Sequence, residues 1–261
     1  MLHLLSSLAA RWISPLLKRI QDRARWWPLG LFPVRSNIVI RQLAINDHTI
    51  TLRFPDNEFD RQQWELSHLF IDDPYQLALL PKNIRTILDV GGNSGLFALL
   101  ARHYFPEANI HCYEPNPVLL PVIQTNTSAF NIRVFPEGVG STASRATMNC
   151  EGPTLEGSTV PSDSGNITIT ALSQALERIG GSVDLLKMDC EGAEWSILED
   201  TTSLSKVRHL AMEYHLDEKG THSVANLIHR LKDLGFFIDS FREASNPLVG
   251  QLTATNRSFS P

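Results

Sequence analysis

The sequence predicts an α/β protein with a doubly wound, mostly parallel sheet of seven strands, preceded by a helix and a β-hairpin. Two observations carry this prediction. From residue 81 onward, short apolar stretches alternate with amphipathic helical patterns, as in a parallel sheet covered by helices. The stretch 87–95 also runs from apolar residues into Asp89, Gly91 and Gly92, which is typical of a buried strand that turns sharply into a helix. Doubly wound sheets bind ligands at such a turn.

The size and composition indicate one large globular domain with an N-terminal extension. A chain of 261 residues suffices for this arrangement. We expect a helical extension at 1–34, a hairpin and lid segment at 35–80, and a core domain at 81–261. With 43% hydrophobic and 20% charged residues, the chain is not of the disordered class. The formal net charge of −5 argues against a general nucleic-acid binder, which needs a basic surface.

Cysteine usage and hydropathy predict a soluble, cytoplasmic protein. Cys112, Cys150 and Cys190 are widely spaced without metal-ligand spacing, as expected of buried thiols in a reducing compartment. The apolar stretches fall short of the roughly 20 residues that span a bilayer. The segment 1–10 lacks basic residues ahead of its leucines, which argues against a secretory signal.

Residues 5–20 carry apolar side chains at helical intervals, whereas the segment from Arg11 to Arg25 is mainly basic on the other side. Two alternatives stay open. The helix packs on its own domain or on the second subunit of a homodimer, or residues 1–27 make a peripheral contact with the anionic inner membrane surface. Tryptophans at 12, 26 and 27 would then anchor the helix at the interface.

The segment before the core domain predicts a hairpin and a lid. Residues 37–44 and 48–54 alternate in polarity around a turn at Asn46, which indicates a β-hairpin. Residues 55–80 combine helical spacing around Trp64 with a break at Asp72–Pro74, where a second helix is expected to start. We expect this segment to form a wall of the ligand site.

The pattern of residues 81–261 predicts strands and helices that alternate regularly, with one interruption. Strands are expected at 86–90, 109–114, 132–136, 183–189, 207–214, 236–242 and 249–255, and helices at 94–104, 117–129, 169–179, 192–199 and 222–234. The last helix stops at Gly235, a typical C-cap residue. Residues 141–165 are rich in Ser, Thr, Gly and Pro and are expected to form at most short strands.

The ends of the first two core strands indicate a nucleoside site. Glu114 closes the second strand some two dozen residues after Asp89, where an acidic residue binds ribose hydroxyls. The turn reads D-x-G-G-N-S-G rather than the dinucleotide pattern G-x-G-x-x-G. Asp89 would repel a pyrophosphate, so a cofactor with a ribose, a purine and a cationic centre fits better. As an alternative, Asp89 only caps the following helix.

This turn is similar to motif I of class I, Rossmann-like methyltransferases that use S-adenosyl-L-methionine. The segment 186–194, which contains K-x-D followed by x-E-G-A-E, resembles the hallmark of the FkbM family. The segments 167–172 and 212–215 are similar to the segments that flank this hallmark in the family. The chain departs from the family at 92–94, where it has Gly-Asn-Ser instead of the usual Ala-Asn-Ile.

The resemblance implies transfer of the methyl group of S-adenosyl-L-methionine to an oxygen. The implied acceptor is a hydroxyl of a sugar, a glycan or a secondary metabolite. The cofactor is expected to contact the glycine turn and the ends of the neighbouring strands, at Asp89, Gly91, Gly92, Asn93, Gly95, Glu114, Pro115, Asn116, Gly138, Val139 and Asp189.

An alcohol becomes a good nucleophile when a base removes its proton. Asp189 and His215 each lie at the end of a core strand, and we expect them to serve as this base without ranking them. His215 as an ordinary hydrogen-bonded residue is the alternative. Glu213 is expected to orient His215 or bind substrate. Lys187, in a buried strand, is expected to pair with one of the nearby carboxylates at 189, 191 and 194, with catalysis as a secondary role.

Three further hypotheses are weaker. The acidic residues 189, 191, 194 and 213 suit Mg²⁺ or Ca²⁺, but Lys187 among them argues against an ion, so no metal is predicted. An NAD(P)-dependent oxidoreductase on the same sheet is disfavoured by the glycine spacing. A non-catalytic cofactor-binding module is disfavoured by the presence of Asp189, Glu213 and His215.

Overall fold

A computed structural model describes residues 42–55, 58–149, 158–217, 222–244 and 246–259. The predicted helix at 5–20 and its two alternatives lie outside these residues, as do Cys150 and the first part of the predicted hairpin. Within the described part of the chain, every helix is too short or too polar to cross a bilayer.

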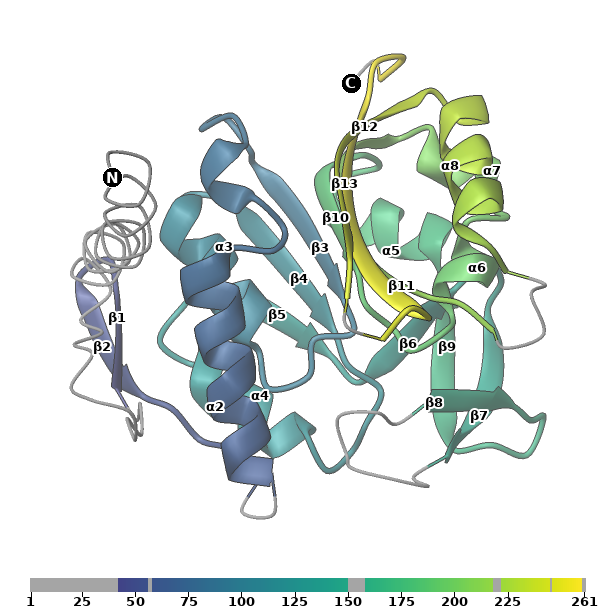
Figure 1. The fold of residues 1–261 in the computed structure, drawn as a ribbon. Helices are drawn as coiled ribbons and strands as arrows, with labels where there is room; N and C mark the ends of the chain where they lie inside the picture. The colour runs from purple at the N-terminus through teal and green to yellow at the C-terminus, as the bar shows by residue number, and fades with distance from the viewer. Residues whose placement is uncertain (1–41, 56–57, 150–157, 218–221, 245, 260–261) are drawn as a thin grey trace, which may run out of the picture.

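The core of the fold is a seven-stranded sheet in the order β12-β13-β11-β10-β3-β4-β5 (Figure 1). Its strands are β3 (Thr86–Val90), β4 (Asn109–Tyr113), β5 (Ile132–Phe135), β10 (Val183–Met188), β11 (Val207–His215), β12 (Phe236–Glu243) and β13 (Val249–Asn256). Neighbouring strands from β5 to β11 pair in parallel, whereas β13 is antiparallel to both β11 and β12. The predicted fold class is confirmed.

Helices cover both faces of this sheet, as its apolar strands require. One face carries α2 (Phe59–Ser67), α3 (Leu96–Tyr104) and α4 (Leu120–Thr127). The other carries α5 (Leu172–Ile179), α6 (Glu194–Ile197), α7 (Thr201–Leu204) and α8 (Val224–Asp233). In α5 the buried residues recur at 172, 175, 176 and 179, which is the spacing of one helical face.

A second, four-stranded sheet has the order β6-β9-β7-β8. It contains β6 (Glu137–Gly140), β7 (Ser144–Asn149), β8 (Ser158–Pro161) and β9 (Ile167–Ala171). The short strands β7 and β8 confirm the expectation for 141–165. The predicted helix at 169–179 was wrong at its start, because β-branched residues extend β9 to Ala171. In place of the helix predicted at 192–199, the structure has the short helix α6, which is followed by α7.

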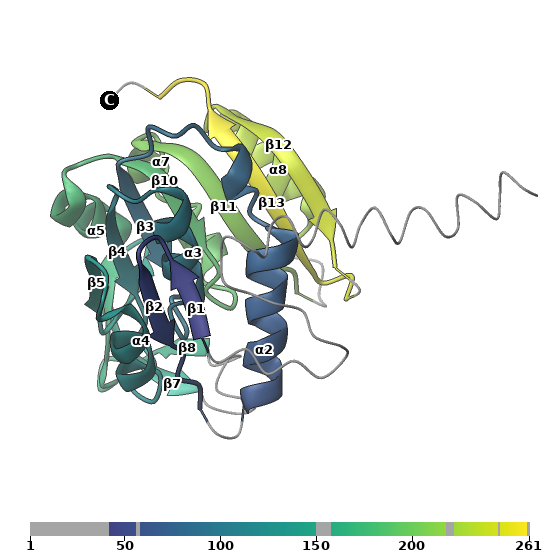
Figure 2. The same ribbon diagram turned by 90° about the vertical axis from the view of Figure 1, so that its left-hand side faces the viewer.

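The hairpin and the lid precede the core. Strands β1 (Gln42–Ile45) and β2 (His48–Thr51) pair antiparallel around Asn46, as predicted, and the hairpin lies beside α3 (Figures 1 and 2). After α2, a π-helical turn (His68–Asp72) and a 3₁₀ turn (Leu77–Leu79) replace the helix predicted near Asp72–Pro74. The Asp73 carboxylate accepts hydrogen bonds from the amides of Leu77 at 2.8 Å and Ala78 at 3.0 Å.

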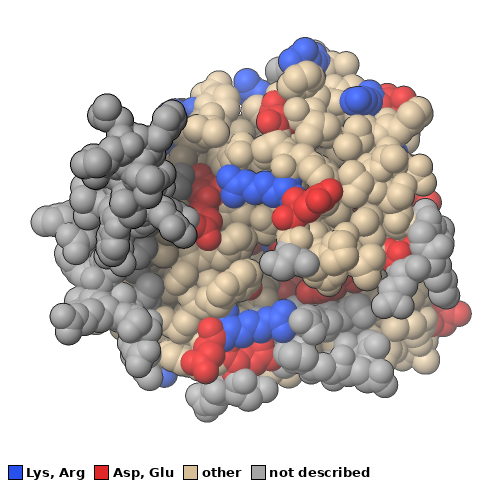
Figure 3. Space-filling model, in the orientation of Figure 1, with Lys and Arg blue, Asp and Glu red and all other residues tan. Residues whose placement is uncertain are grey.

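The visible surface has no single dominant charge. On the face that Figure 3 shows, Lys and Arg side chains of the described residues lie among Asp and Glu side chains rather than forming one broad basic area. Such an area would be needed for general nucleic-acid binding. The absence of a nucleic-acid partner stays a prediction.

A buried ion pair connects the two central strands. Lys187 of β10 lies opposite Asp89 of β3 in the parallel register, and its Nζ is 3.2 Å from Asp89 Oδ1. Nζ also donates to the carbonyl oxygens of Gly91 at 2.5 Å and Val90 at 3.4 Å. The sequence predicted pairing with Asp189, Glu191 or Glu194, but Asp189 Oδ2 is farther away, at 3.8 Å. Lys187 thus pairs with Asp189 as predicted, but its closest carboxylate is that of Asp89, which the sequence did not indicate as a partner.

Replacing Lys187 by Met is expected to lower the free energy of unfolding by about 3 to 5 kcal/mol, because it leaves Asp89 as an uncompensated buried charge. Urea denaturation measures this change. Adding Asp89→Asn should recover part of the loss, and exposed Lys206→Met should change stability by less than about 0.5 kcal/mol. A Lys187→Met protein as stable as the Lys206→Met control would contradict the role given to the ion pair.

Candidate active site

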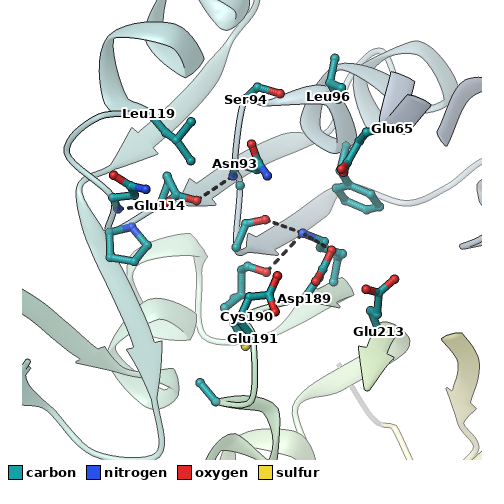
Figure 4. A pocket seen from close by; sticks show the side chains of 18 of the residues that line it. Glu65, Asn93, Ser94, Leu96, Glu114, Leu119, Asp189, Cys190, Glu191 and Glu213 are labelled. Atoms are coloured by element: carbon teal, nitrogen blue, oxygen red, sulfur yellow. Dashed lines mark hydrogen bonds and ion pairs between the residues drawn. The ribbon is translucent and has the colours of Figure 1, made fainter. Parts of the chain in front are cut away.

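A pocket opens where β3, β4 and β10 end, between the main sheet and the lid (Figure 4). Its wall combines the glycine turn, the residues that follow three core strands, and the side of α2 that faces the sheet. The carboxyl ends of parallel strands meet at one edge, so residues distant in sequence converge here.

The glycine turn leaves no room for side chains. Gly91 has φ of +82°, and a Cβ there would lie 1.7 Å from the carbonyl oxygen of Asp189. The amides of Gly91 and Gly92 donate to the carbonyl oxygen of Tyr113, at 3.1 and 2.9 Å. Asn93 adopts φ of +48°, and Gly95 precedes α3 at φ of +86°. The turn thus holds backbone close to the pocket, which favours the close approach of a ligand.

Glu114 lies at the far end of this turn. Its carboxylate accepts hydrogen bonds from the amides of Asn93 and Asn116, each at 2.7 Å. Burial raises the pKa of Glu114 to about 7, although these two hydrogen bonds oppose the shift. Pro115, Gly138 and Val139 line the same part of the pocket. The structure therefore brings together the residues predicted to bind the nucleoside.

Two predicted cofactor-binding residues lie outside the pocket wall. Asp89 is fully buried behind the turn, where it contacts Lys187 and accepts from Cys112 Sγ at 3.2 Å. Gly95 lies at the start of α3 and faces Ile123 and Thr127. Asp89 does not cap α3, whose N-cap residue is Gly95. Contact of Asp89 with a cofactor stays a prediction, but its geometry favours support of the turn through Lys187.

Carboxylates gather at the other end of the pocket, and Asp189, Glu191 and Glu213 line this end. Tyr75 donates its hydroxyl to Asp189 Oδ2 at 3.2 Å, and Gln251 donates to Glu213 Oε2 at 2.8 Å. Burial, followed by the charge of Asp189, raises the pKa of Glu213 to about 7. Burial is also the main reason that the pKa of Glu191 rises to about 7. The carboxylates of Glu191 and Glu213 are therefore basic enough to bind a proton near neutral pH.

His215 is outside the pocket wall and is surrounded by carboxylates. Its Nδ1 lies 3.4 Å from Glu194 Oε1, and its Nε2 lies 3.5 Å from Glu191 Oε2 and 3.7 Å from Glu213 Oε1. Burial would lower the pKa of His215, but Glu194, and then Glu191, raise it to about 9. The imidazole is therefore protonated at neutral pH and has no free lone pair for a proton. This geometry disfavours the predicted role of His215 as the base.

Glu194 fixes the position of this imidazolium. The Glu194 carboxylate is completely buried and accepts from the amides of Cys190 at 2.7 Å and Gly192 at 2.8 Å. Its pKa is lowered, because the hydrogen bond and charge of His215 outweigh the burial that would raise it. The buried Glu194 and the half-buried His215 thus form a structural pair behind the pocket.

The residues of the lid were not identified from the sequence. Arg61, Trp64, Glu65 and His68 line the pocket from α2 and the turn after it, and Tyr75 lines it from the following loop. The Trp64 side chain is 63% exposed and stacks on His68, with ring centroids 4.9 Å apart. Helical spacing at 61, 65 and 68 places three of these residues on one side of the lid. This spacing was the available signal, but the sequence did not show which side faces the pocket.

Among the described residues, one ligand atom each of Asp189, Glu191 and His215 lie within 4.8 Å of one another, close enough for a single ion to reach. An ion there would have to displace the proton of His215. The positive charge of Lys187, which led us to expect no metal, is paired most closely with Asp89. The absence of a metal stays a prediction.

Comparison with known proteins identifies the family. Residues 89–238 match the family described as Methyltransferase FkbM domain. The chain is 28% identical over 193 residues to Methyltransferase sdnD of Sordaria araneosa, covering 58% of this chain and 74% of that protein. It is 26% identical over 206 residues to Methyltransferase 1 of Beauveria bassiana, covering 65% of this chain and 79% of that protein.

A solved structure of similar description is the methyltransferase FkbM from Methylobacillus flagellatus, with 18% identity and a TM-score of 0.46 over 77% of this chain and 56% of that one. The family match spans more than half of the chain and contains the glycine turn, Glu114 and the K-x-D-x-E-G-A-E segment. The chain therefore belongs to the FkbM family of methyltransferases, and its cofactor is S-adenosylmethionine.

Proposed function

We propose that this methyltransferase is an O-methyltransferase that acts on a hydroxyl of a sugar, a glycan or a secondary metabolite. The observation that carries the proposal is the group of carboxylates with raised pKa at the end of the pocket away from Glu114. An alcohol requires a base within reach, and groups with pKa near 7 are suited to that task. The exposed Trp64 at the rim also favours an acceptor with a ring face.

The residues of the pocket fit S-adenosylmethionine. Each Glu114 oxygen accepts a hydrogen bond from one backbone amide and can accept a second one from a ribose hydroxyl. At Gly92 a side chain would collide with Cys112, since an added Cβ lies 2.2 Å from its sulfur. The cofactor supplies an electrophilic methyl group on a sulfonium. The chain would hold the nucleoside at Glu114 and direct the methyl toward Asp189 and Glu213, where positioning supplies much of the rate.

Within this proposal Asp189 and His215 have different roles. Asp189 lines the pocket and binds the Tyr75 hydroxyl, so it is placed to orient the acceptor or the cofactor. His215 holds its proton between Glu194, Glu191 and Glu213, and acts as a positioning residue. It would keep these carboxylates close together despite their mutual repulsion.

Changing Glu114 to Gln is expected to weaken binding of S-adenosylhomocysteine by about 10- to 100-fold, because one carboxylate oxygen of the ribose site is lost. Isothermal titration calorimetry measures the affinity, with NADH as a second ligand that should not bind. Exposed Glu107→Gln is the matched control and should behave as the wild type. Unchanged affinity in Glu114→Gln would contradict the ribose site, and wild-type protein that binds only NADH would contradict the cofactor.

The chemical class of the methyl acceptor can be tested separately. Incubation with cofactor carrying a labelled methyl group, together with a panel of methyl glycosides, phenols and simple amines, should yield labelled ethers. Mass spectrometry identifies the methylated atom. Products labelled only on nitrogen would refute O-methylation while leaving the methyltransferase activity intact.

The charge on His215 predicts a stability change at alkaline pH. The pKa of His215 is about 9 in the folded protein against 6.5 for an ordinary histidine, so its contribution is complete below pH 6.5 and is lost as the pH rises through 9. Between pH 7.5 and 10 the wild type should lose about 1 to 3 kcal/mol more stability than His215→Asn. Denaturation at several pH values measures this, with exposed His229→Asn as control. Parallel curves for wild type and His215→Asn would show that His215 is not protonated at neutral pH.

A further inference from the structure

The lid contributes one carboxylate to the pocket that the family match does not include. Glu65 lies on α2, upstream of the matched residues 89–238, and lines the pocket. Figure 4 shows its side chain at the same opening as Asp189 and Glu213, and away from Glu114. The core strands and the lid therefore face each other across the part of the pocket where an acceptor would enter.

Glu65 differs from the other acids of the site, each of which has a polar partner. Asp189 accepts from Tyr75, Glu213 accepts from Gln251, and Glu114 accepts from two backbone amides. The Glu191 carboxylate lies 3.5 Å from His215 Nε2. Among the described residues, the Glu65 carboxylate forms no hydrogen bond and no ion pair. Its lone pairs are therefore available to a hydroxyl in the pocket.

The charged groups around Glu65 shift its pKa in opposite directions. Burial raises its pKa to about 7, and the charges of Asp189 and Glu213 act in the same direction. Lys187 and Arg61 oppose the shift. Asp189, by contrast, already accepts a hydrogen bond from the Tyr75 hydroxyl and lies 3.8 Å from Lys187 Nζ.

We propose that Glu65 is a catalytic residue that receives the proton of the acceptor hydroxyl. This inference rests on the proposed O-methyltransferase function.

In the proposed step, the bond between the acceptor oxygen and the methyl carbon forms while the bond between that carbon and sulfur breaks. The hydroxyl proton passes to the Glu65 carboxylate, and S-adenosylhomocysteine leaves as a neutral sulfide. The positive charge of the sulfonium and the negative charge of Glu65 disappear together, so the balance of charge is preserved. Glu65 then returns its proton to solvent.

The Glu65→Gln variant tests this catalytic role, and Asp60→Asn is the matched control for effects on the folding of α2. Both variants remove one acid from α2, but Asp60 is exposed and outside the pocket. Calorimetry with S-adenosylhomocysteine and with sinefungin, which carries an amine in place of the sulfonium methyl, reports on the charge next to the transferred group. Glu65→Gln should bind sinefungin about 5- to 30-fold more weakly and S-adenosylhomocysteine within about twofold of the wild type.

Kinetics complete the test. On an acceptor found in the labelled-methyl assay, Glu65→Gln should lower kcat by about 10²- to 10⁴-fold with an unchanged KM for S-adenosylmethionine. The fall in rate below about pH 7 should also weaken in this variant. If Glu65→Gln matches Asp60→Asn in ligand binding, Glu65 does not face the methyl group, and the inference fails while the proposed function stands. If wild-type protein binds neither ligand, the proposed function fails and the role of Glu65 fails with it.

Discussion

The contact of Lys187 with Asp89 and the Gly91 carbonyl is the interaction on which the rest of the site depends. An ammonium group buried between two parallel strands requires a nearby anion and several acceptors. Asp89 supplies the charge, and the carbonyl oxygens of Val90 and Gly91 supply the remaining acceptors. Because these carbonyls belong to the glycine turn, the same side chain that compensates Asp89 also fixes the backbone that forms the pocket wall. The carboxylate of Asp189 lies farther from Lys187, at 3.8 Å, and lines the pocket.

Their position relative to the pocket also divides the acidic residues into two groups. Asp89 and Glu194 are completely buried and face cations, Lys187 and His215 respectively. Glu65, Glu191 and Glu213 line the pocket, and burial gives each a pKa near 7. The first group supports the structure behind the pocket wall. The second group remains able to bind a proton or a positively charged centre, and the sulfonium of the cofactor is such a centre.

The sequence predicted the fold and the residues that gather at the Glu114 end of the pocket, because both depend on local patterns. Apolar stretches of strand length, the D-x-G-G-N-S-G turn and Glu114 at the end of the next strand each follow from neighbouring residues. Parallel strands end at the same edge, so these local features necessarily meet there. The acceptor end was predicted less completely. Asp189 and Glu213 were identified because they also end strands, whereas Glu65 was missed because its place depends on how the lid docks.

By itself the sequence determined the sheet and the glycine turn, since each is encoded in contiguous residues whose periodicity or backbone requirements are readable. The cofactor followed from the resemblance of this turn and of the K-x-D-x-E-G-A-E segment to the FkbM family. Only the tertiary structure decided which acid neutralises Lys187, whether His215 carries a proton, and which lid residues reach the pocket. Each of these depends on distances of a few ångströms between segments far apart in the chain, such as 3.2 Å between Lys187 and Asp89. Electrostatic energy and burial change steeply over such distances, and no local pattern in the sequence specifies them.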